Sequence, residues 1–309
     1  MALLRQTRTG ALSVVETEHL VGRSPRASLH IDQSYVSGQH ASLRWVQTGW
    51  ELKDLGSRNG TLVDDAPIKP GQTFCLARGN RISFGSAEQT WELIDDSPPK
   101  VMVVPLEGGG KPIFPEGDIL ALPSEEDPRA MVFRASDGAW SLERQDEIVP
   151  LASNQLFEAS GLHFRFSCPD VVAETWTEEW PEGEATGVAR LHLLFRASMD
   201  EEYVEIEADM GSRRENLGSR GHNYLLLLLA RRRMSDAARD LTETACGWVY
   251  QDELVDSLRI SPERLNIDIF RIRRQFASLG VSDPANIVER RPRTKQLRIG
   301  VASLTVRTI

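Results

Sequence analysis

The chain has 309 residues, 40% of them hydrophobic, and a formal net charge of −9. It is too long for one small domain, since domains usually hold about 100 to 200 residues, and we expect three units. Its apolar runs are too short to cross a bilayer, and its first residues lack the apolar stretch of a secretory signal. We therefore expect a cytoplasmic protein without a membrane partner.

Charge is distributed unevenly along the chain. Residues 1–100 carry 11 basic and 11 acidic side chains, residues 101–210 carry 7 and 23, and residues 211–309 carry 18 and 11. A surface that binds a polyanion is therefore expected in the last third. A further hypothesis is that the acidic middle mimics DNA and inhibits the basic third, so that removing residues 101–186 would raise DNA affinity.

Residues 1–96 predict an all-β sandwich, because short apolar runs alternate with Gly, Pro, Asn and Asp. Paired prolines in residues 95–100 indicate a linker. The strands are expected at residues 11–16, 41–46, 50–55, 61–64, 73–77, 80–85 and 90–95.

Three short motifs in this domain carry phosphate-binding chemistry: Gly22-Arg23, Ser37-x-x-His40, and the turn SRNGT at residues 57–61. A glycine before Arg23 allows the backbone to bend, so that the guanidinium presents two donors to a phosphate. Ser37 adds a hydroxyl donor. The Asn-Gly pair predicts a tight turn from which the asparagine amide can bind an extended peptide.

The order of these motifs, with the segment WELKDL before SRNGT and NRISFG after it, resembles the forkhead-associated (FHA) family over residues 1–95. The resemblance implies a sandwich that binds a phosphothreonine segment of a partner protein, downstream of a serine/threonine kinase. It implies that Arg23, Ser37 and Arg58 hold the phosphate and that Asn59 holds the peptide main chain. The residues with an implied structural role are Gly22, His40 and Gly60.

This chain departs from the family pattern at two places. Gly38 stands where the family often has Arg or Asn, which removes one phosphate donor, and Asp64-Asp65 replaces a frequent Asn-Gly. The second change places negative charge near the peptide surface.

Residues 101–186 predict a β-rich, acidic middle region with an acidic stretch at residues 174–184. The order of apolar residues and turns in residues 129–166 parallels that in residues 40–84. A degenerate FHA-like repeat explains this parallel, and so do two unrelated β segments with similar alternation.

Residues 187–309 predict an α+β domain. Two strands precede helices at residues 223–234, 252–259 and 262–278, and a basic hairpin follows. In the third helix, Ser261 and Pro262 form a start signal. Its apolar stripe is expected to consist of Leu265, Ile269, Ile272 and Phe276.

This pattern resembles the winged-helix effector domain of response regulators. The resemblance implies binding of double-stranded DNA, with Arg271, Arg273 and Arg274 facing the DNA from the helix. The implied wing contacts are Arg291, Arg293 and Lys295. On this hypothesis the protein is a transcription regulator, and the alternative is a phospho-dependent adaptor whose winged helix contacts protein without DNA.

We expect no enzyme activity, no cofactor and no metal site. The chain has no P-loop, no H-E-x-x-H and no G-x-S-x-G motif.

Overall fold

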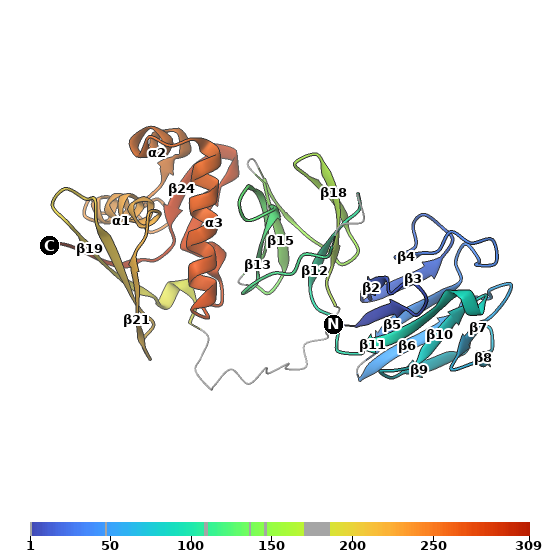
Figure 1. The fold of residues 1–309 in the computed structure, drawn as a ribbon. Coiled ribbons are helices and arrows are strands. Elements are labelled where there is room, and N and C mark those ends of the chain that lie inside the picture. The colour runs from blue at the N-terminus through green and yellow to red at the C-terminus, as the bar shows by residue number, and fades with distance from the viewer. Residues whose placement is uncertain (1, 47, 108–110, 136, 145–146, 170–185) are drawn as a thin grey trace.

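The computed structural model describes residues 2–46, 48–107, 111–135, 137–144, 147–169 and 186–309, so the acidic stretch at residues 174–184 lies outside the described residues. Figure 1 shows three units in a row, with the N-terminal sandwich at one end and the helices at the other. None of the helices in these ranges is long and apolar enough to span a membrane.

The N-terminal unit is a sandwich of two sheets. One has the order β2-β1-β11-β10-β7-β8 and the other the order β4-β3-β5-β6-β9. The strands of the first sheet are β1 Leu3–Gln6, β2 Leu12–Val14, β7 Thr61–Val63, β8 Ala66–Ile68, β10 Arg81–Phe84 and β11 Thr90–Asp95. Those of the second are β3 Glu18–Gly22, β4 Leu29–His30, β5 Ala41–Val46, β6 Gly49–Asp54 and β9 Thr73–Leu76, and a 3-10 turn covers Ala87–Gln89.

The predicted sandwich is confirmed, and its core is built by the alternation that predicted it. Leu43, Leu52, Trp50, Phe84 and Leu93 are each 0% exposed. Strands β1, β3, β4 and β8 were missed, because they are short or follow turn residues without a clear alternation.

The middle unit is a second, smaller sandwich with sheets β12-β18-β17 and β13-β14-β15-β16. Its strands are β12 Met102–Pro105, β13 Ile119–Pro123, β14 Pro128–Arg134, β15 Trp140–Glu143, β16 Ile148–Pro150, β17 Leu156–Ala159 and β18 Leu162–Ser167. Its orders match β1-β11-β10 and β3-β5-β6-β9 of the first sandwich strand for strand, and every corresponding pair is antiparallel. The strand order therefore favours the repeat over two unrelated β segments.

The C-terminal unit combines a sheet of order β21-β20-β19-β25 with a small sheet of order β22-β24-β23. Its strands are β19 His192–Ala197, β20 Val204–Asp209, β21 Arg214–Ser219, β22 Val249–Tyr250, β23 Val288–Arg291, β24 Gln296–Ile299 and β25 Ser303–Thr308. Its helices are α1 Asn223–Ala237, α2 Gln251–Leu258 and α3 Pro262–Ser278, with 3-10 turns at Val188–Arg190, Pro284–Ile287 and Pro292–Thr294. All three helices were predicted in place, whereas β21, β22 and β25 were missed. The assignment to the winged-helix type stays a prediction.

Helix α3 joins the middle and C-terminal units. Its predicted stripe of Leu265, Ile269, Ile272 and Phe276 is fully buried, and Ser261 caps it by accepting the N–H of Arg264. Its other side packs against β13 and β14, as Figure 1 shows. One hydrophobic cluster therefore contains residues from both sides of the boundary predicted at residues 186 and 187.

Candidate functional site

Gly22 brings two loops of the N-terminal sandwich into direct contact. The N–H groups of Arg23 and Ser24 donate to the carbonyl oxygens of Ser37 and Gly38, at 2.9 and 3.0 Å. A Cβ at Gly22 would lie 2.2 Å from the Gly38 oxygen, so any side chain there would separate the loops. Gly22 is therefore needed for close approach, which is a different reason from the backbone bend that the sequence suggested.

His40 braces the same loops from inside the domain. Its Nδ1 accepts the N–H of Ser37 at 3.1 Å, and its Nε2 lies 3.1 Å from the carbonyl oxygen of Gly60. Burial lowers the pKa of His40 below its usual value, so the ring is neutral at pH 7 and donates from Nε2. The implied structural role of His40 and Gly60 agrees with this geometry, since the ring ties the second motif to the third.

Asp54, which the sequence reasoning did not single out, shapes the SRNGT turn. One carboxylate oxygen accepts the N–H groups of Gly56 and Ser57, and the other accepts the hydroxyls of Ser57 and Thr61 at 2.6 Å each. Burial raises the pKa of Asp54, but these hydrogen bonds outweigh burial and lower it overall. The signal was an aspartate three residues before a serine in a turn, a pattern typical of an Asx turn.

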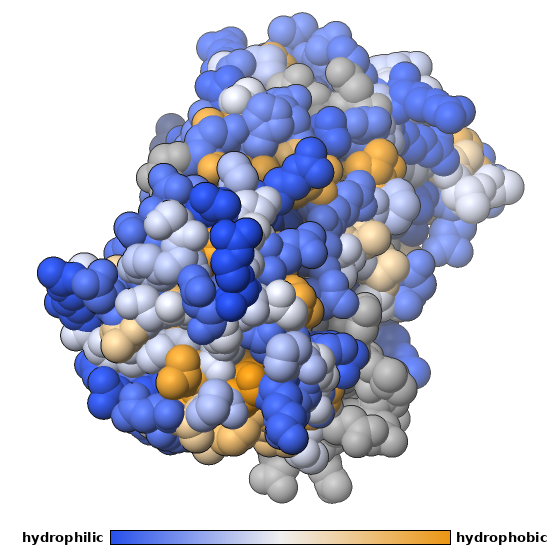
Figure 2. Space-filling model, turned by 90° about the vertical axis from the view of Figure 1, so that its right-hand side faces the viewer, coloured by the Kyte–Doolittle hydropathy of each residue, from blue (hydrophilic) through white to orange (hydrophobic). Residues whose placement is uncertain are grey.

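Arg23 and Arg58 are both exposed, and their backbones meet at Ser37, since the N–H of Arg23 donates to the Ser37 carbonyl oxygen at 2.9 Å. Neither forms an ion pair with any of the described residues. The Ser37 hydroxyl oxygen accepts the backbone N–H of Arg58 at 3.1 Å, which leaves its own hydrogen available to a ligand. Figure 2 views this end of the molecule, whose surface is mostly hydrophilic with separate small hydrophobic patches.

Asn59 and Asp64 each form hydrogen bonds with other residues of the N-terminal domain. The Asn59 amide donates to the carbonyl oxygen of Tyr35 at 2.8 Å, which leaves its second N–H and its oxygen for a peptide. Asp64 accepts from the Asn80 amide at 2.6 Å and from the backbone N–H of Arg81 at 2.8 Å. The charge of Asp64 is thus partly compensated by two donors at the start of β10.

A family model described as the FHA domain matches residues 19–85, which contain all three motifs. The N-terminal domain is an FHA domain. The chain is 36% identical over 73 residues to the FHA domain-containing protein FhaA of Mycobacterium tuberculosis, covering 24% of this chain and 13% of that protein. It is 38% identical over 68 residues to protein phosphatase 2C 70 of Arabidopsis thaliana, covering 21% of this chain and 12% of that protein.

This chain thus spans about an eighth of the length of these two relatives. Among solved structures, one from a study of phosphothreonine-dependent FHA domain interactions is 28% identical, with a TM-score of 0.28. The match covers 31% of this chain and 97% of the chain in that solved structure.

The arginines of α3 do not form the DNA-facing row that the sequence predicted. Arg271 is exposed, but Arg273 is 1% exposed and donates to Glu143 of the middle sandwich and to the carbonyl oxygen of Val288. The prediction for Arg273 is wrong, because a guanidinium buried between two domains cannot reach a phosphate. Arg274 forms ion pairs with Glu116 and Glu125, also from the middle sandwich.

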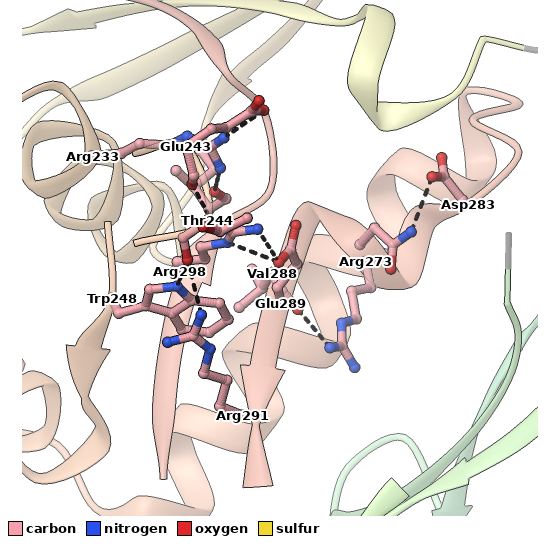
Figure 3. A network of polar contacts seen from close by, with 12 residues as sticks. Arg233, Glu243, Thr244, Trp248, Arg273, Asp283, Val288, Glu289, Arg291 and Arg298 are labelled. Atoms are coloured by element: carbon pink, nitrogen blue, oxygen red, sulfur yellow. Dashed lines mark hydrogen bonds and ion pairs between the residues drawn. The ribbon is translucent and has the colours of Figure 1, made fainter. Parts of the chain in front are cut away.

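The basic hairpin is accessible by contrast, with Arg291, Arg293 and Lys295 all exposed. The Arg291 guanidinium lies 3.9 Å from the ring centroid of Trp248 and donates to the carbonyl oxygen of Thr244. Arg298 lies 4.6 Å from the same ring, and Figure 3 shows Trp248 beside both arginines. Sequence reasoning missed Trp248, which orders this hairpin through two cation–π contacts.

Proposed function

We propose that this protein binds phosphothreonine segments of partner proteins and acts in signalling downstream of a serine/threonine kinase, as a binding protein and not as an enzyme. FHA domains bind phosphothreonine peptides. The observation that carries the proposal is the pair Arg23 and Arg58: both are exposed, neither forms an ion pair with a described residue, and the backbone N–H of each donates to Ser37.

The energetics support switching by phosphorylation. A phosphothreonine carries about −1.5 to −2 charge at neutral pH, and each charge-assisted hydrogen bond contributes about 1.5–3 kcal/mol. Two guanidinium groups and one hydroxyl supply at least three such hydrogen bonds, about 4.5–9 kcal/mol together, against an association cost on the order of 4–15 kcal/mol. The phosphate contacts therefore supply a large share of the binding free energy, and the peptide main chain has to supply the rest. Removal of the phosphate removes most of this attraction.

The test is fluorescence anisotropy with a degenerate phosphothreonine peptide library, with unphosphorylated and phosphoserine libraries as controls. Arg23→Ala and Arg58→Ala are each expected to weaken binding at least about tenfold, which corresponds to the loss of one charged hydrogen bond. Arg26→Ala is the matched control, because Arg26 is also exposed and lies in the same loop. Equal binding by Arg23→Ala and Arg26→Ala would refute the phosphate site.

We propose that the C-terminal domain contacts another protein, so that the chain acts as a phospho-dependent adaptor. The burial of Arg273 and the ion pairs of Arg274 favour this alternative over DNA binding by α3. Transcription regulation is retained as the second candidate function because Arg291, Arg293 and Lys295 remain exposed on the hairpin.

Binding of a labelled DNA duplex at several salt concentrations separates the two candidates, because each phosphate contact contributes a salt slope of about −0.9. Arg291→Ala combined with Arg293→Ala is expected to remove any salt-dependent binding if the hairpin contacts DNA. An adaptor shows no such binding in the wild-type protein.

A further inference from the structure

The two sandwiches can be aligned residue by residue through their strand pairing. In the N-terminal sandwich Leu43 lies opposite both His19 and Leu52, and in the middle sandwich Val132 lies opposite both Leu120 and Leu142. In this alignment β6 corresponds to β15, and each of these strands carries a Trp-x-Leu segment, at residues 50–52 and 140–142. The inner faces correspond, since these residues are buried in their own sandwich core.

The outer faces of the two corresponding sheets differ in character. In the N-terminal sandwich this face carries partly or fully exposed residues, namely Glu18, Leu20, Ser42, Arg44 and Lys53. At the register-equivalent positions the middle sandwich has buried residues, namely Ile119, Ala121, Met131, Phe133 and Glu143. Strands β13 and β14 are therefore buried on both faces, one of which faces another domain.

The element that covers this outer face is α3. The helix has a second buried stripe of Phe270, Arg273 and Ala277, spaced i, i+3 and i+7. The four apolar residues of the sheet face belong to the same hydrophobic cluster as Phe270 and Phe276. Gly117, just before β13, has no room for a side chain, because a Cβ there would lie 2.7 Å from the Ala277 Cβ.

Charge is reversed at the positions that meet α3. Glu143, which takes the register position of Lys53, lies 3.0 Å from Arg273 and 3.2 Å from Arg290, and all three side chains are at most 4% exposed. The loop after β13, which replaces the loop that carries Arg23, supplies Glu125 to Arg274. Glu143 therefore binds two guanidinium groups at a register position where the first sandwich carries a lysine, and the loop after β13 adds a second carboxylate.

We propose that the outer face of the middle sandwich is permanently covered by α3, so that the two domains form one folding unit and the side of α3 that carries Arg273 and Arg274 contacts no external partner, DNA included. Separation of the domains would expose four apolar side chains to water and break the ion pairs of Glu143 with Arg273 and Arg290. The burial of the four apolar side chains favours the bound arrangement, and the ion pairs of Glu143 fix its geometry. The proposal does not depend on phosphopeptide binding by the first domain.

Hydrogen exchange of the full chain tests this proposal. In the wild-type protein, amides of α3 are expected to be as protected as those of β14, because one opening event exposes both. Phe133→Glu is expected to speed exchange in α3 at least about tenfold while the first sandwich is unaffected. Arg44→Glu, at the register-equivalent exposed position, is the matched control and leaves α3 unchanged.

Phe133→Ala gives a second measurement if the charged variant does not fold, and a smaller increase of the same sign is expected in α3. Two results would overturn the proposal. The first is that the amides of α3 exchange as slowly in both Phe133 variants as in the wild-type protein, while β13 to β16 remain folded. The other is salt-dependent duplex binding by the wild-type chain that Arg274→Ala abolishes and Arg44→Glu does not.

Discussion

Arg273 on α3 donates a hydrogen bond of 3.0 Å to Glu143 on β15, and both side chains are 2% exposed. Arg290 on β23 lies 3.2 Å from the other oxygen of the same carboxylate. Burial lowers the pKa of Arg290 below its usual value, although the attraction of Glu143 opposes this shift. One buried carboxylate from the middle domain thus compensates two guanidinium groups of the C-terminal domain.

Glu143→Gln is therefore expected to destabilise the chain by about 3–5 kcal/mol, because it leaves two buried guanidinium groups without an anion. The measurement is the urea midpoint of the transition that includes α3. Glu147→Gln is the control, since Glu147 is half-exposed and pairs with the partly exposed Arg144, a contact worth about 0–1 kcal/mol. Similar midpoints for the two variants would contradict the assigned role of Glu143.

Gly117→Ala is expected to destabilise the contact between the middle domain and α3. A Cβ at Gly117 would lie 2.7 Å from the Ala277 Cβ, and Gly117 has a positive φ of 57°. Gly161→Ala separates the steric clash from the backbone strain, because Gly161 has a φ of 75° but open space around it. Thermal unfolding should show a larger loss for Gly117→Ala; equal losses would mean that only backbone strain matters.

Gly22→Ala is expected to abolish phosphopeptide binding and to lower the melting temperature of the FHA domain. The new methyl group would lie 2.2 Å from the Gly38 carbonyl oxygen, so the loops that carry Arg23 and Ser37 must move apart. Gly38→Ala has nothing within 4 Å of its Cβ and should leave the melting temperature nearly unchanged. The prediction fails if Gly22→Ala binds the peptide as the wild type does.

Gly38→Arg is expected to strengthen phosphopeptide binding. Gly38 follows Ser37 directly and its side-chain direction is open, so an arginine there adds a third guanidinium near the phosphate. An increase of about tenfold in affinity corresponds to one charged hydrogen bond of about 1.5 kcal/mol. Gly38→Glu reverses the charge and should weaken binding in the same anisotropy measurement.

The FHA domain is expected to lose stability in acid through its buried histidines. Burial, with a smaller effect of Arg165, lowers the pKa of His19 from 6.5 to about 3, and burial also lowers that of His40. Below pH 6.5 the unfolded chain takes up protons that the folded domain does not, so stability falls as pH falls towards 3. The slope is at most about 1.4 kcal/mol per pH unit for each histidine.

Urea midpoints measured between pH 7 and pH 4 check this prediction. Carboxylates whose pKa is lowered, such as Asp54, add to the loss only near and below their unfolded pKa of about 3.9. His19→Gln should reduce the slope between pH 6.5 and pH 5, a range in which the carboxylates contribute little. An unchanged slope in this variant would show that His19 titrates normally.

The motif residues of the first domain could be found from sequence because their roles depend on local geometry. Gly22, His40 and the SRNGT turn each act through neighbours within the same set of loops, and their spacing is visible along the chain. The apolar stripe of α3, its cap at Ser261 and its end at Ser278 were predicted for the same reason. Asp54 was missed because an aspartate in a turn is common and its four hydrogen bonds cannot be seen from spacing.

The arginines of α3 were assigned wrongly for a different physical reason. Their spacing places them away from the first apolar stripe, and an arginine in that position faces solvent, DNA or another domain. The sequence alone does not distinguish these surroundings, because the partner of Arg273 lies 130 residues away on β15. The buried outer face of β13 and β14 had the same ambiguity, since a strand buried on both faces shows no alternation.

The local sequence patterns determined that this chain carries an FHA domain with three recognisable motifs, a β-rich middle and three helices at predictable positions. The tertiary structure decided which surfaces stay accessible. It closes the outer face of the second sandwich on α3 and leaves Arg23, Arg58 and the basic hairpin exposed. The reason is that burial is a property of contacts between distant segments, whereas the sequence pattern reports only which face of an element is apolar.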